Sequence, residues 1–514
     1  MSKANNLPKI GKTVLETLTS GMYDDPRFIY REYIQNAVDQ IDEAVDLKIL
    51  KRRSEGEVLI NIDSQAGYVV IEDNATGIKA SMMRRFLSDV ANSEKDPTKR
   101  KGFRGIGRLG GLGYSEKLIF ETSYKGELVK SIMTLDSANL GKIIANRQDD
   151  SDAAQVISII TTVTTNSEKA DAHYFRVILS GVKNEAILNI DSVYSYLSIV
   201  APVPFDSDFA FRDRILSHFE SRGLKLDEYK VRLNKKIITK AYKNNLLDSS
   251  GQVYAHITSI GFFDVKDQED YLLALGWYGI PDLVNKVIEK ENIERGIRIR
   301  SGNIGVGDEK TLMARFKVER TNLRYIGEVH IVGEGFTPNA RRDYFNDNRT
   351  VSEFQSSLES IFTDFENRLP HRASDLHNRS KEIKVFRSSV ESFRKELPAF
   401  KTAVERDQRF EELEKALSVA KKASKKIQKI KEEAQTSPPL NDLFKSIIHD
   451  FDFDVTDKEI SEFKSAPVYP PLKFRRVTAD QSKILNEVVI FLQQELGHSG
   501  ANKLIQKLQK KYDK

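Results

Sequence analysis

Apolar residues recur at helical spacing near the start of the chain. From Val14 to Glu43 they fall three or four positions apart, with a break at Tyr23-Asp24-Asp25-Pro26. Because proline fits the first turn of a helix, Pro26 marks the start of a new helix. The segment is therefore expected to form two successive helices.

Shorter apolar runs follow, with the pattern of strands. Val58–Ile62 and Tyr68–Glu72 flank the turn residues Ser64-Gln65-Ala66-Gly67, which predicts a β-hairpin. Four later segments have the same pattern: 117–124, 129–135, 156–164 and 174–179. Together with the helices they predict an α/β sandwich over residues 1–185.

The rest of the chain divides into three further regions by pattern. Strand-like runs at 254–260, 296–301 and 325–332 predict an α+β middle domain over residues 186–350. Residues 351–435 have helical spacing typical of long helices or a coiled coil, with Pro398 expected to break it. Thr436-Ser437-Pro438-Pro439 has the composition of a linker, and 440–514 is expected to be a small helical region. The predicted fold class is α+β.

Composition excludes several classes of protein. The 514 residues contain no cysteine, which excludes disulfide frameworks and thiolate metal sites. Eighty basic and 75 acidic residues leave a net charge of +5, too small to indicate nucleic-acid binding by itself. Neither a signal peptide nor an apolar run of membrane-spanning length is present, so a cytoplasmic protein without a membrane partner is expected.

One predicted helix has an ordered polar face. Glu32, Asn36 and Asp39 stand at i, i+4 and i+7 and project from one side. A carboxylate, a carboxamide and a second carboxylate can hold Mg²⁺ and orient a water for attack on a phosphate. An ordinary charged surface helix would show the same residues, so this stretch alone leaves both interpretations open.

Two more segments carry candidate chemistry. Asp73 ends an apolar strand, where it can accept a hydrogen bond from an adenine amino group, and Gly77 lets the backbone approach a flat base. The segment Gly102–Gly113 is rich in glycine, which is typical of a mobile loop or of a backbone that closely approaches a ligand, and its N–H groups can wrap a polyphosphate. It contains G-x-G-x-x-G, but no strand precedes it and no G-K-[ST] ends it, which argues against Rossmann and P-loop sites.

In this order and spacing, the three segments resemble the GHKL superfamily, which includes gyrase, the ninety-kilodalton heat-shock chaperones, sensor histidine kinases and MutL. Leu15–Asp39 looks most similar to the chaperone branch, and the resemblance covers about the first 185 residues. It implies a Bergerat-type ATP-binding fold with ATP and Mg²⁺. A sensor kinase is excluded because no histidine precedes His173.

The resemblance also implies roles for particular residues. Glu32 would be the general base, Asn36 the Mg²⁺ ligand, Asp39 a nucleotide-contacting acid, and Asp73 the reader of adenine. The remaining expected nucleotide contacts line the base or belong to a lid that begins near residue 91; they are Gly77, Ile78, Lys101, Arg104, Gly105, Gly107, Gly110, Gly111 and Gly113.

The chain departs from the family pattern at three places. Ala75 stands where the first glycine of D-x-G-x-G is expected, and Leu112 where a small residue is expected. Ala172-His173 replaces the later Gly-Thr pair, so adenine binding through that threonine is not expected. His173 is interpreted as a strand-edge side chain.

A later loop resembles the one that delivers an arginine to the terminal phosphate in the chaperone branch. In Gly335–Phe345, Arg342 occupies that position and Arg341 is the alternative. Arginine suits the role because its charge is permanent and its guanidinium is planar. A structural ion pair of Arg342 with Asp343 or another acid is the competing interpretation.

These features favour an Mg-dependent ATPase whose hydrolysis opens and closes a homodimeric, chaperone-like machine acting on a protein client. A component of bacterial antiviral defence that gates a separately encoded effector fits equally. The alternative is a DNA-binding clamp of the microrchidia or MutL type, with the lysines between 421 and 431 on phosphates. The same lysines also fit a solvated helix face.

Overall fold

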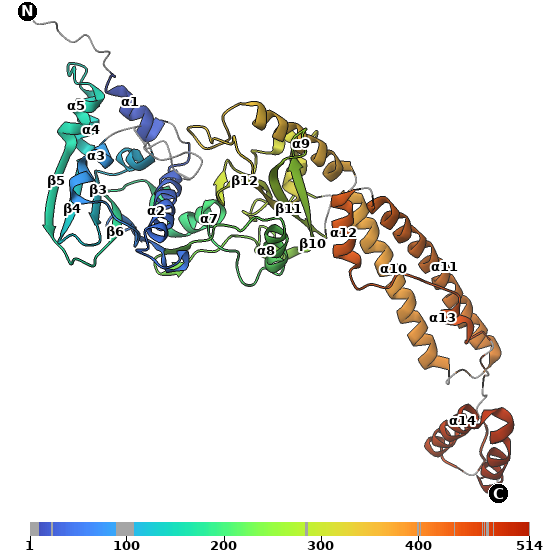
Figure 1. Cartoon of the computed structure of the whole chain (residues 1–514). Coiled ribbons are helices and arrows are strands. Elements are labelled where there is room, and N and C mark those ends of the chain that lie inside the picture. Colours follow the sequence, from blue (N-terminus) through green and yellow to red (C-terminus); the bar gives the residue numbers. More distant parts are fainter. Residues whose placement is uncertain are drawn as a thin grey trace, which may run out of the picture. The chain divides into compact units, whose positions relative to one another are not determined.

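The computed structural model describes residues 10–512 except for 22–23, 89–106, 283–285, 368, 398–399, 401, 436, 465, 467, 469–471 and 476. The chain separates into two compact units, Met1–Asn367 and Arg368–Lys514. The first contains two sheets with helices, and the second is helical (Figure 1). The predicted α+β class with a helical carboxy-terminal region is thus confirmed.

The first sheet has eight strands in the order β5-β4-β3-β6-β2-β1-β7-β8. All neighbours are antiparallel except β1 and β7, which are parallel. The strands are β1 Glu57–Asp63, β2 Tyr68–Asp73, β3 Lys117–Ser123, β4 Val129–Asp136, β5 Thr161–Ser167, β6 Tyr174–Ser180, β7 Lys230–Leu233 and β8 Lys236–Ile237. Buried and exposed residues alternate along β1, as expected when one face is covered.

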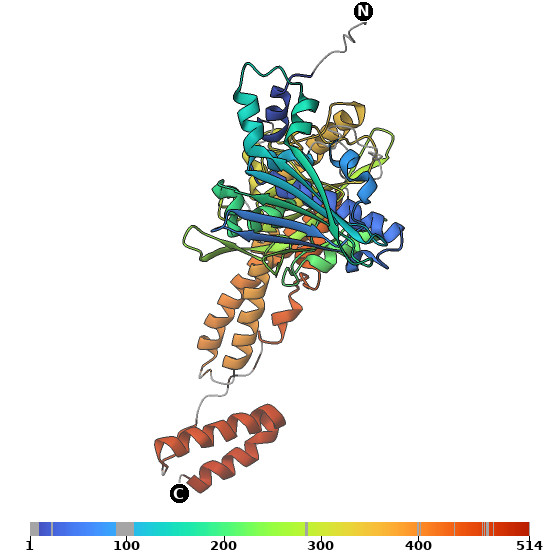
Figure 2. The same cartoon turned by 90° about the vertical axis from the view of Figure 1, so that its left-hand side faces the viewer.

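Helices pack on one face of this sheet, and Figure 2 looks onto the strands from the other side. They are α1 Thr13–Glu16, a π-helical turn Thr17–Gly21, α2 Phe28–Asp46, α3 Met83–Ser88, α4 Ser137–Ala145, α5 Ala153–Ile160, α6 Glu185–Leu188 and α7 Ile190–Val200. Short 3-10 helices lie at Arg53–Glu55, Ala80–Met82 and Gly107–Gly113. The predicted hairpin and the helix that carries Glu32 are confirmed.

One strand prediction is wrong in part. Residues 156–164 were expected to be a strand, but α5 continues to Ile160 and β5 begins at Thr161. The helix starts with a capping box, in which Asp152 accepts from the backbone of Gln155 and the Gln155 side chain accepts from the backbone of Asp152. This box stabilises a helical start that the apolar run by itself does not show.

The second sheet has six strands in the order β13-β12-β14-β11-β10-β9. They are β9 Asn245–Leu247, β10 Val253–Lys266, β11 Leu272–Pro281, β12 Gly296–Ser301, β13 Ile304–Val306 and β14 Ile326–Ile331. The accompanying helices are α8 Arg212–Ser221, α9 Arg349–Asn367 and the 3-10 turns Met313–Arg315 and Glu319–Arg324. The predicted strands at 254–260, 296–301 and 325–332 are confirmed.

A buried ionic cluster ties the second sheet to the first part of the unit. Glu328 is fully buried; it pairs with Lys240 at 2.7 Å and with Arg300, and it forms a hydrogen bond with Nε2 of His330 at 2.9 Å. Arg300 also donates to the carbonyl of Ala201, at 3.2 Å, just after α7. The nearby cationic groups hold the pKa of the Glu328 carboxyl well below its usual range although burial opposes them, so the cluster keeps a charged centre.

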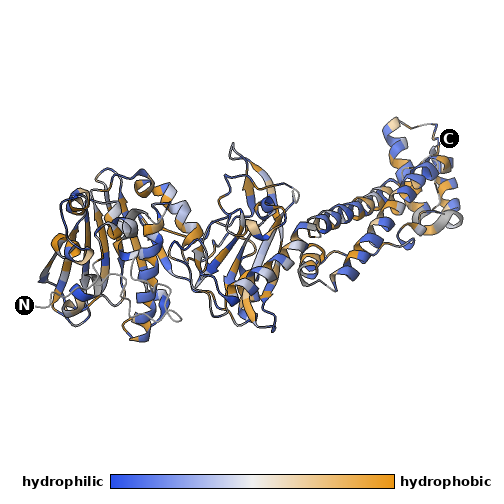
Figure 3. Cartoon of the chain, turned by 90° about the horizontal axis from the view of Figure 1, so that it is seen from above, coloured by the Kyte–Doolittle hydropathy of each residue, from blue (hydrophilic) through white to orange (hydrophobic). Residues whose placement is uncertain are grey.

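The second unit consists of helices whose hydrophobic and polar residues alternate around their circumference (Figure 3). They are α10 Leu369–Glu396, α11 Ala403–Ala434, α12 Pro438–Ile448, α13 Lys458–Ser461 and α14 Ala479–Tyr512. The expected break is confirmed, since α10 ends at Glu396, although Pro398 itself lies outside the described residues. The predicted linker is wrong in part, because Pro438 and Pro439 begin α12. No helix in the described part of the chain is long and apolar enough to cross a membrane.

Candidate functional site

The α2 helix places the polar face predicted from the sequence at the edge of the core. Tyr30, Ile34 and Val38 are buried in the first core. The other side carries Glu32, which is 8% exposed, and Asp39, which is 1% exposed. Asn36, between them, is half-buried. A carboxylate is costly to bury without partners, so this face needs compensating groups.

Arg342 supplies one of these groups. Its Nε lies 3.0 Å from Oε1 of Glu32, and both side chains are 11% exposed. Arg31, also on α2, has its Nε 3.8 Å from the same oxygen. Its Nη2 also donates to the backbone carbonyl of Arg341 at 3.4 Å. The loop after β14 therefore delivers Arg342, while the side chain of Arg341 is exposed to solvent.

The backbone at Arg342 is unusual. Its φ is +57°, in the left-handed region that few non-glycine residues adopt. Two backbone hydrogen bonds hold this turn: Arg342 donates to the carbonyl of Asn339 at 3.2 Å, and Gly307 donates to the carbonyl of Arg342 at 2.8 Å. A strained residue held in this way is typical of functional sites.

Asp73 ends β2 as predicted and is buried, with 3% exposed. The backbone N–H of Ala75 donates to its Oδ1 at 3.0 Å. Burial raises the pKa of the Asp73 carboxyl to about 7; the charge of Glu72 adds to this rise and the Ala75 bond opposes it. A buried carboxyl at this position can accept from an adenine amino group, which makes Asp73 the strongest candidate for base recognition.

The turn after Asp73 accommodates the departures from the family pattern. Ala75 is fully buried, so its methyl group fits, and its carbonyl lies 2.7 Å from Nδ1 of His173. Gly77 has φ +65°, and a Cβ there would lie 1.9 Å from the carbonyl oxygen of Ser123. Only glycine fits this position.

Thr122 of β3 is a neighbour of this turn that the sequence analysis missed. Its Oγ1 accepts from the backbone N–H of Ile78 at 2.9 Å and donates to the carbonyl of Tyr174 at 2.8 Å. A threonine near the end of a strand is common, so the sequence alone does not single out Thr122. Its place beside the turn becomes visible only in the structure, where it lies opposite Phe175 of β6.

The described part of the glycine-rich segment is ordered against α2. Of the two expected alternatives, a mobile loop or a backbone that closely approaches a ligand, residues 107–113 do not form a loop but a 3-10 helix, with Gly110 and Gly111 buried; the approach to a ligand stays a prediction. The Tyr33 hydroxyl donates to the carbonyl of Arg108 at 3.1 Å and accepts from Gly111 N–H at 3.0 Å. The packing leaves no room for a side chain at Gly111, since a Cβ there would lie 2.7 Å from that hydroxyl.

Gly107 brings the start of this segment against the carboxylate of Glu32. A Cβ at Gly107 would lie 2.2 Å from Oε2 of Glu32. Leu112 is buried in the core, whereas Gly113 is exposed at the end of the segment. Lys101, Arg104, Gly105 and the predicted start of the lid lie outside the described residues. The structure thus brings Glu32, Gly107 and Arg342 together.

The donor groups determine which metal fits. Within the described residues, no three histidine, aspartate or glutamate side chains gather into a metal-binding cluster. Mg²⁺ typically binds proteins through one or two side chains plus water and substrate phosphates. The carboxamide of half-buried Asn36, one turn after Glu32, suits this kind of binding.

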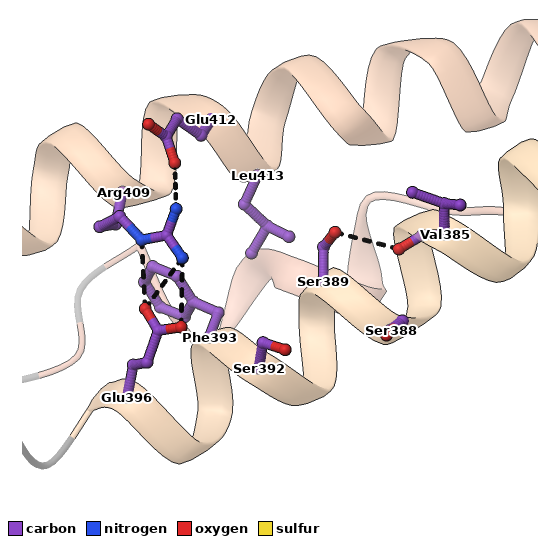
Figure 4. A pocket seen from close by; sticks show the side chains of 9 residues that line it. All are labelled: Val385, Ser388, Ser389, Ser392, Phe393, Glu396, Arg409, Glu412 and Leu413. Carbon is purple, nitrogen blue, oxygen red and sulfur yellow. Dashed lines mark hydrogen bonds and ion pairs between the residues drawn. The ribbon is translucent and has the colours of Figure 1, made fainter.

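A separate pocket of about 330 Å³ lies between α10 and α11 (Figure 4). Arg409 donates to both carboxylate oxygens of Glu396, at 3.0 and 3.1 Å, and also pairs with Glu412. Ser389 donates to the carbonyl of Val385 at 3.0 Å. The charged groups that line the pocket are paired with one another, which argues for helix packing rather than phosphate binding.

The lysine-rich stretch of α11 divides into two groups. Lys421 pairs with Asp457 at 2.6 Å, and Lys431 lies over the ring of Phe453. The other four lysines, Lys422, Lys425, Lys426 and Lys429, are exposed. Their spacing of three and four places them on one side of the helix.

Comparison with known proteins finds similarity in the first part of the chain. Residues 27–168 match the family model described as histidine kinase-, DNA gyrase B-, and HSP90-like ATPase. A stretch of 146 residues is 25% identical to the chaperone protein HtpG of Alcanivorax borkumensis, covering 25% of this chain and 24% of that protein. The match therefore spans about a quarter of the length of this curated relative.

Among solved structures, the ATPase region of Saccharomyces cerevisiae topoisomerase II aligns with a TM-score of 0.38 and 12% identity. The alignment covers 66% of this chain and 83% of that one, and its score is too low for a comparison of sites. The family match includes α2, the β1–β2 hairpin and the glycine segment, whereas the loop that carries Arg342 lies outside the matched residues. Residues 27–168 of this chain are thus similar to the GHKL superfamily of ATPases.

Proposed function

We propose that the chain hydrolyses ATP to ADP and phosphate at the face of α2 that carries Glu32. The ion pair between Glu32 and Arg342 carries this proposal, because it joins a buried carboxylate and a permanent cation from distant parts of the chain. General-base and charge-stabilising roles require these two kinds of group.

In the proposed reaction, the oxygen of a water attacks the terminal phosphorus of ATP. The bond between that phosphorus and the bridging oxygen breaks, and its electron pair leaves with ADP. Glu32 accepts the proton of the water, and Arg342 stabilises the charge that spreads over the phosphate oxygens. For this to happen, the ion pair between Arg342 and Glu32 must break, and Arg342 must contact the terminal phosphate instead. The Glu32 carboxylate is then free to act as the base.

The other residues bind and orient. Asp73 accepts the adenine amino group, Gly77 and Ile78 line the base, and Asp39 contacts the nucleotide. The glycines from Gly107 to Gly113 approach the phosphates, and Lys101, Arg104 and Gly105 extend that contact. Asn36 would hold Mg²⁺, which neutralises phosphate charge when bound.

We further propose a homodimeric, cytoplasmic, chaperone-like machine. The similarity to chaperone protein HtpG supports this assignment over about 146 residues. Its substrate would be a protein client or a separately encoded effector, including one of antiviral defence. ATP hydrolysis would drive its opening and closing.

A nucleic-acid clamp is the second candidate. The observation that favours it is the row of exposed lysines Lys422, Lys425, Lys426 and Lys429. Binding through these lysines would weaken steeply as salt is raised, with a slope proportional to the number of phosphate contacts. Charge reversal at all four positions should then abolish binding of a duplex, whereas client binding should be unaffected.

The direct test is phosphate release by the purified full chain with Mg-ATP, compared with Glu32→Ala. We expect the variant to bind ATP but to release no phosphate above background. Equal rates in the two proteins would show that Glu32 is not the base.

A further inference from the structure

Gln35 is a polar residue of α2 whose side chain is buried. It is 1% exposed, and neither its Oε1 nor its Nε2 has a hydrogen-bond partner among the residues that the structure describes. Leaving a polar group buried and unpaired is unfavourable, and most such groups in native proteins are satisfied by protein or by water. A carboxamide with both atoms unsatisfied therefore points to a molecule that binds beside it.

The position of Gln35 identifies the site that this molecule would occupy. On α2 it follows Glu32 by three residues and precedes Asp39 by four, so all three lie on neighbouring turns of one side of the helix. One turn earlier, Arg31 and Glu32 contact the loop that carries Arg341 and Arg342. Gln35 thus lies beside the proposed base.

Its chemistry differs from that of the groups around it. Glu32 can only accept when ionised, and Arg342 can only donate. The Gln35 carboxamide has an acceptor oxygen and a donor nitrogen, so it can accept from a water while donating to a phosphate oxygen. Gln40, on the same helix, is already used: it accepts from Thr76 at 2.6 Å and donates to Glu43 at 3.3 Å.

We propose that Gln35 is a second residue, with Glu32, that binds the attacking water and orients it toward the terminal phosphate. This inference rests on the proposed ATPase function and extends it. Two side chains orient the water. Glu32 accepts a hydrogen bond from one O–H and takes that proton during the reaction, whereas the Gln35 Oε1 accepts a hydrogen bond from the other O–H and takes no proton. Gln35 contributes orientation rather than basicity.

The test compares wild type with Gln35→Met, which keeps the length and volume of the side chain but removes both polar atoms. We expect kcat to fall at least about tenfold while the dissociation constant for ATP changes less than about twofold, as for a lost positioning contact. Thermal unfolding of the nucleotide-free variant should occur at an equal or higher temperature, because an unpaired buried amide has been removed.

Gln40→Met is the matched control, because it removes a carboxamide that already has partners on the same helix. We expect it to lower the unfolding temperature and to leave kcat within about twofold of wild type. If wild type hydrolyses ATP and Gln35→Met is equally active, the role of Gln35 is overturned while the proposed ATPase function stands. Loss of kcat accompanied by a lower unfolding temperature would also overturn that role, since Gln35 would then act through the fold. Absence of ATP turnover in wild type would instead refute the proposed function.

Discussion

The Nε atom of Arg342 lies 3.0 Å from Oε1 of Glu32, and both side chains are nearly buried. Arg342 comes from the loop after β14, whereas Glu32 belongs to α2 beside the first sheet. In this state the proposed base is neutralised by the residue that is proposed to stabilise phosphate charge. In the proposed reaction, a terminal phosphate would compete with Glu32 for the guanidinium, so that nucleotide binding would release the base.

Replacement of Arg342 by alanine should reduce phosphate release by roughly 10³-fold, as expected when an arginine that stabilises transition-state charge is removed. The dissociation constant for ATP should change little, because the charge that needs stabilising develops in the transition state. Steady-state kinetics together with calorimetry would measure both quantities.

Arg341→Ala is the matched control for that experiment. Arg341 is exposed, and the contact that the structure shows from it to α2 is made by its backbone carbonyl. We expect nearly wild-type turnover. The reverse result, with Arg341→Ala inactive and Arg342→Ala active, would assign the role to the neighbouring arginine.

Asp73→Asn should abolish ATP binding but stabilise the nucleotide-free protein above pH 7. The carboxamide cannot present two acceptor oxygens, which accounts for the lost binding. It also cannot ionise, so the cost of a buried charge disappears. Calorimetry and chemical unfolding at pH 8 would test the two effects; a destabilised variant would contradict the explanation from burial.

Stability of the wild type should depend on pH through the same residue. The pKa of Asp73 is about 7 in the folded chain and near 3.8 when unfolded. Between these values the folded state holds a proton that the unfolded state has released. Raising the pH through this window therefore lowers the free energy of unfolding.

ATP binding should have the opposite pH dependence, because the ionised carboxylate is the better acceptor for an amino group. From pH 6 to pH 8, the affinity should rise roughly tenfold, following the ionised fraction of a group with a pKa near 7. Glu32→Ala, which keeps Asp73, should show the same rise. A flat profile in both proteins would argue against Asp73 as the base-reading residue.

Much of this site could be predicted from the sequence because its signals are local. The spacing of Glu32, Asn36 and Asp39 fixes one face of a helix, and the position of Asp73 after an apolar run places it at a strand end. Local spacing of this kind survives folding. The roles of these residues stay predictions.

What could not be predicted depends on contacts between distant segments. β7 pairs in parallel with β1, joining residues 57–60 to 230–233, and no local pattern encodes that pairing. Likewise, the glycines at 107–113 are compatible with a mobile loop or with close approach of the backbone to another group, and the sequence does not show that this group includes Phe28 and Tyr33 of α2.

Gly107→Ala tests how closely the glycine segment approaches the base. The added methyl group would lie 2.2 Å from Oε2 of Glu32, so one of the two must move. We expect turnover to fall by roughly 10²-fold, the effect of a displacement of about 1 Å. Gly141→Ala in α4 is the control, since a Cβ there meets nothing within 4 Å; it should leave turnover unchanged.

The ionic cluster around Glu328 should be essential for stability. Glu328→Gln would leave Lys240 and Arg300 buried without their carboxylate, which typically costs about 3–5 kcal/mol. Glu57→Gln is the comparison, because Glu57 pairs with Lys230 and Arg232 near the surface, where such pairs contribute less than about 1 kcal/mol. Urea unfolding followed by circular dichroism would measure both; equal losses would contradict the assigned importance of burial.

The most direct test of the central claim is a calorimetric titration of the Glu32→Ala full chain with Mg-ATP, followed by a phosphate assay on the same sample. The account predicts saturable binding at one site per chain and no phosphate release, with binding abolished when Asp73→Asn is added. Absence of any heat of binding, in this variant and in wild type, would show that the pocket beside α2 does not take an adenine nucleotide.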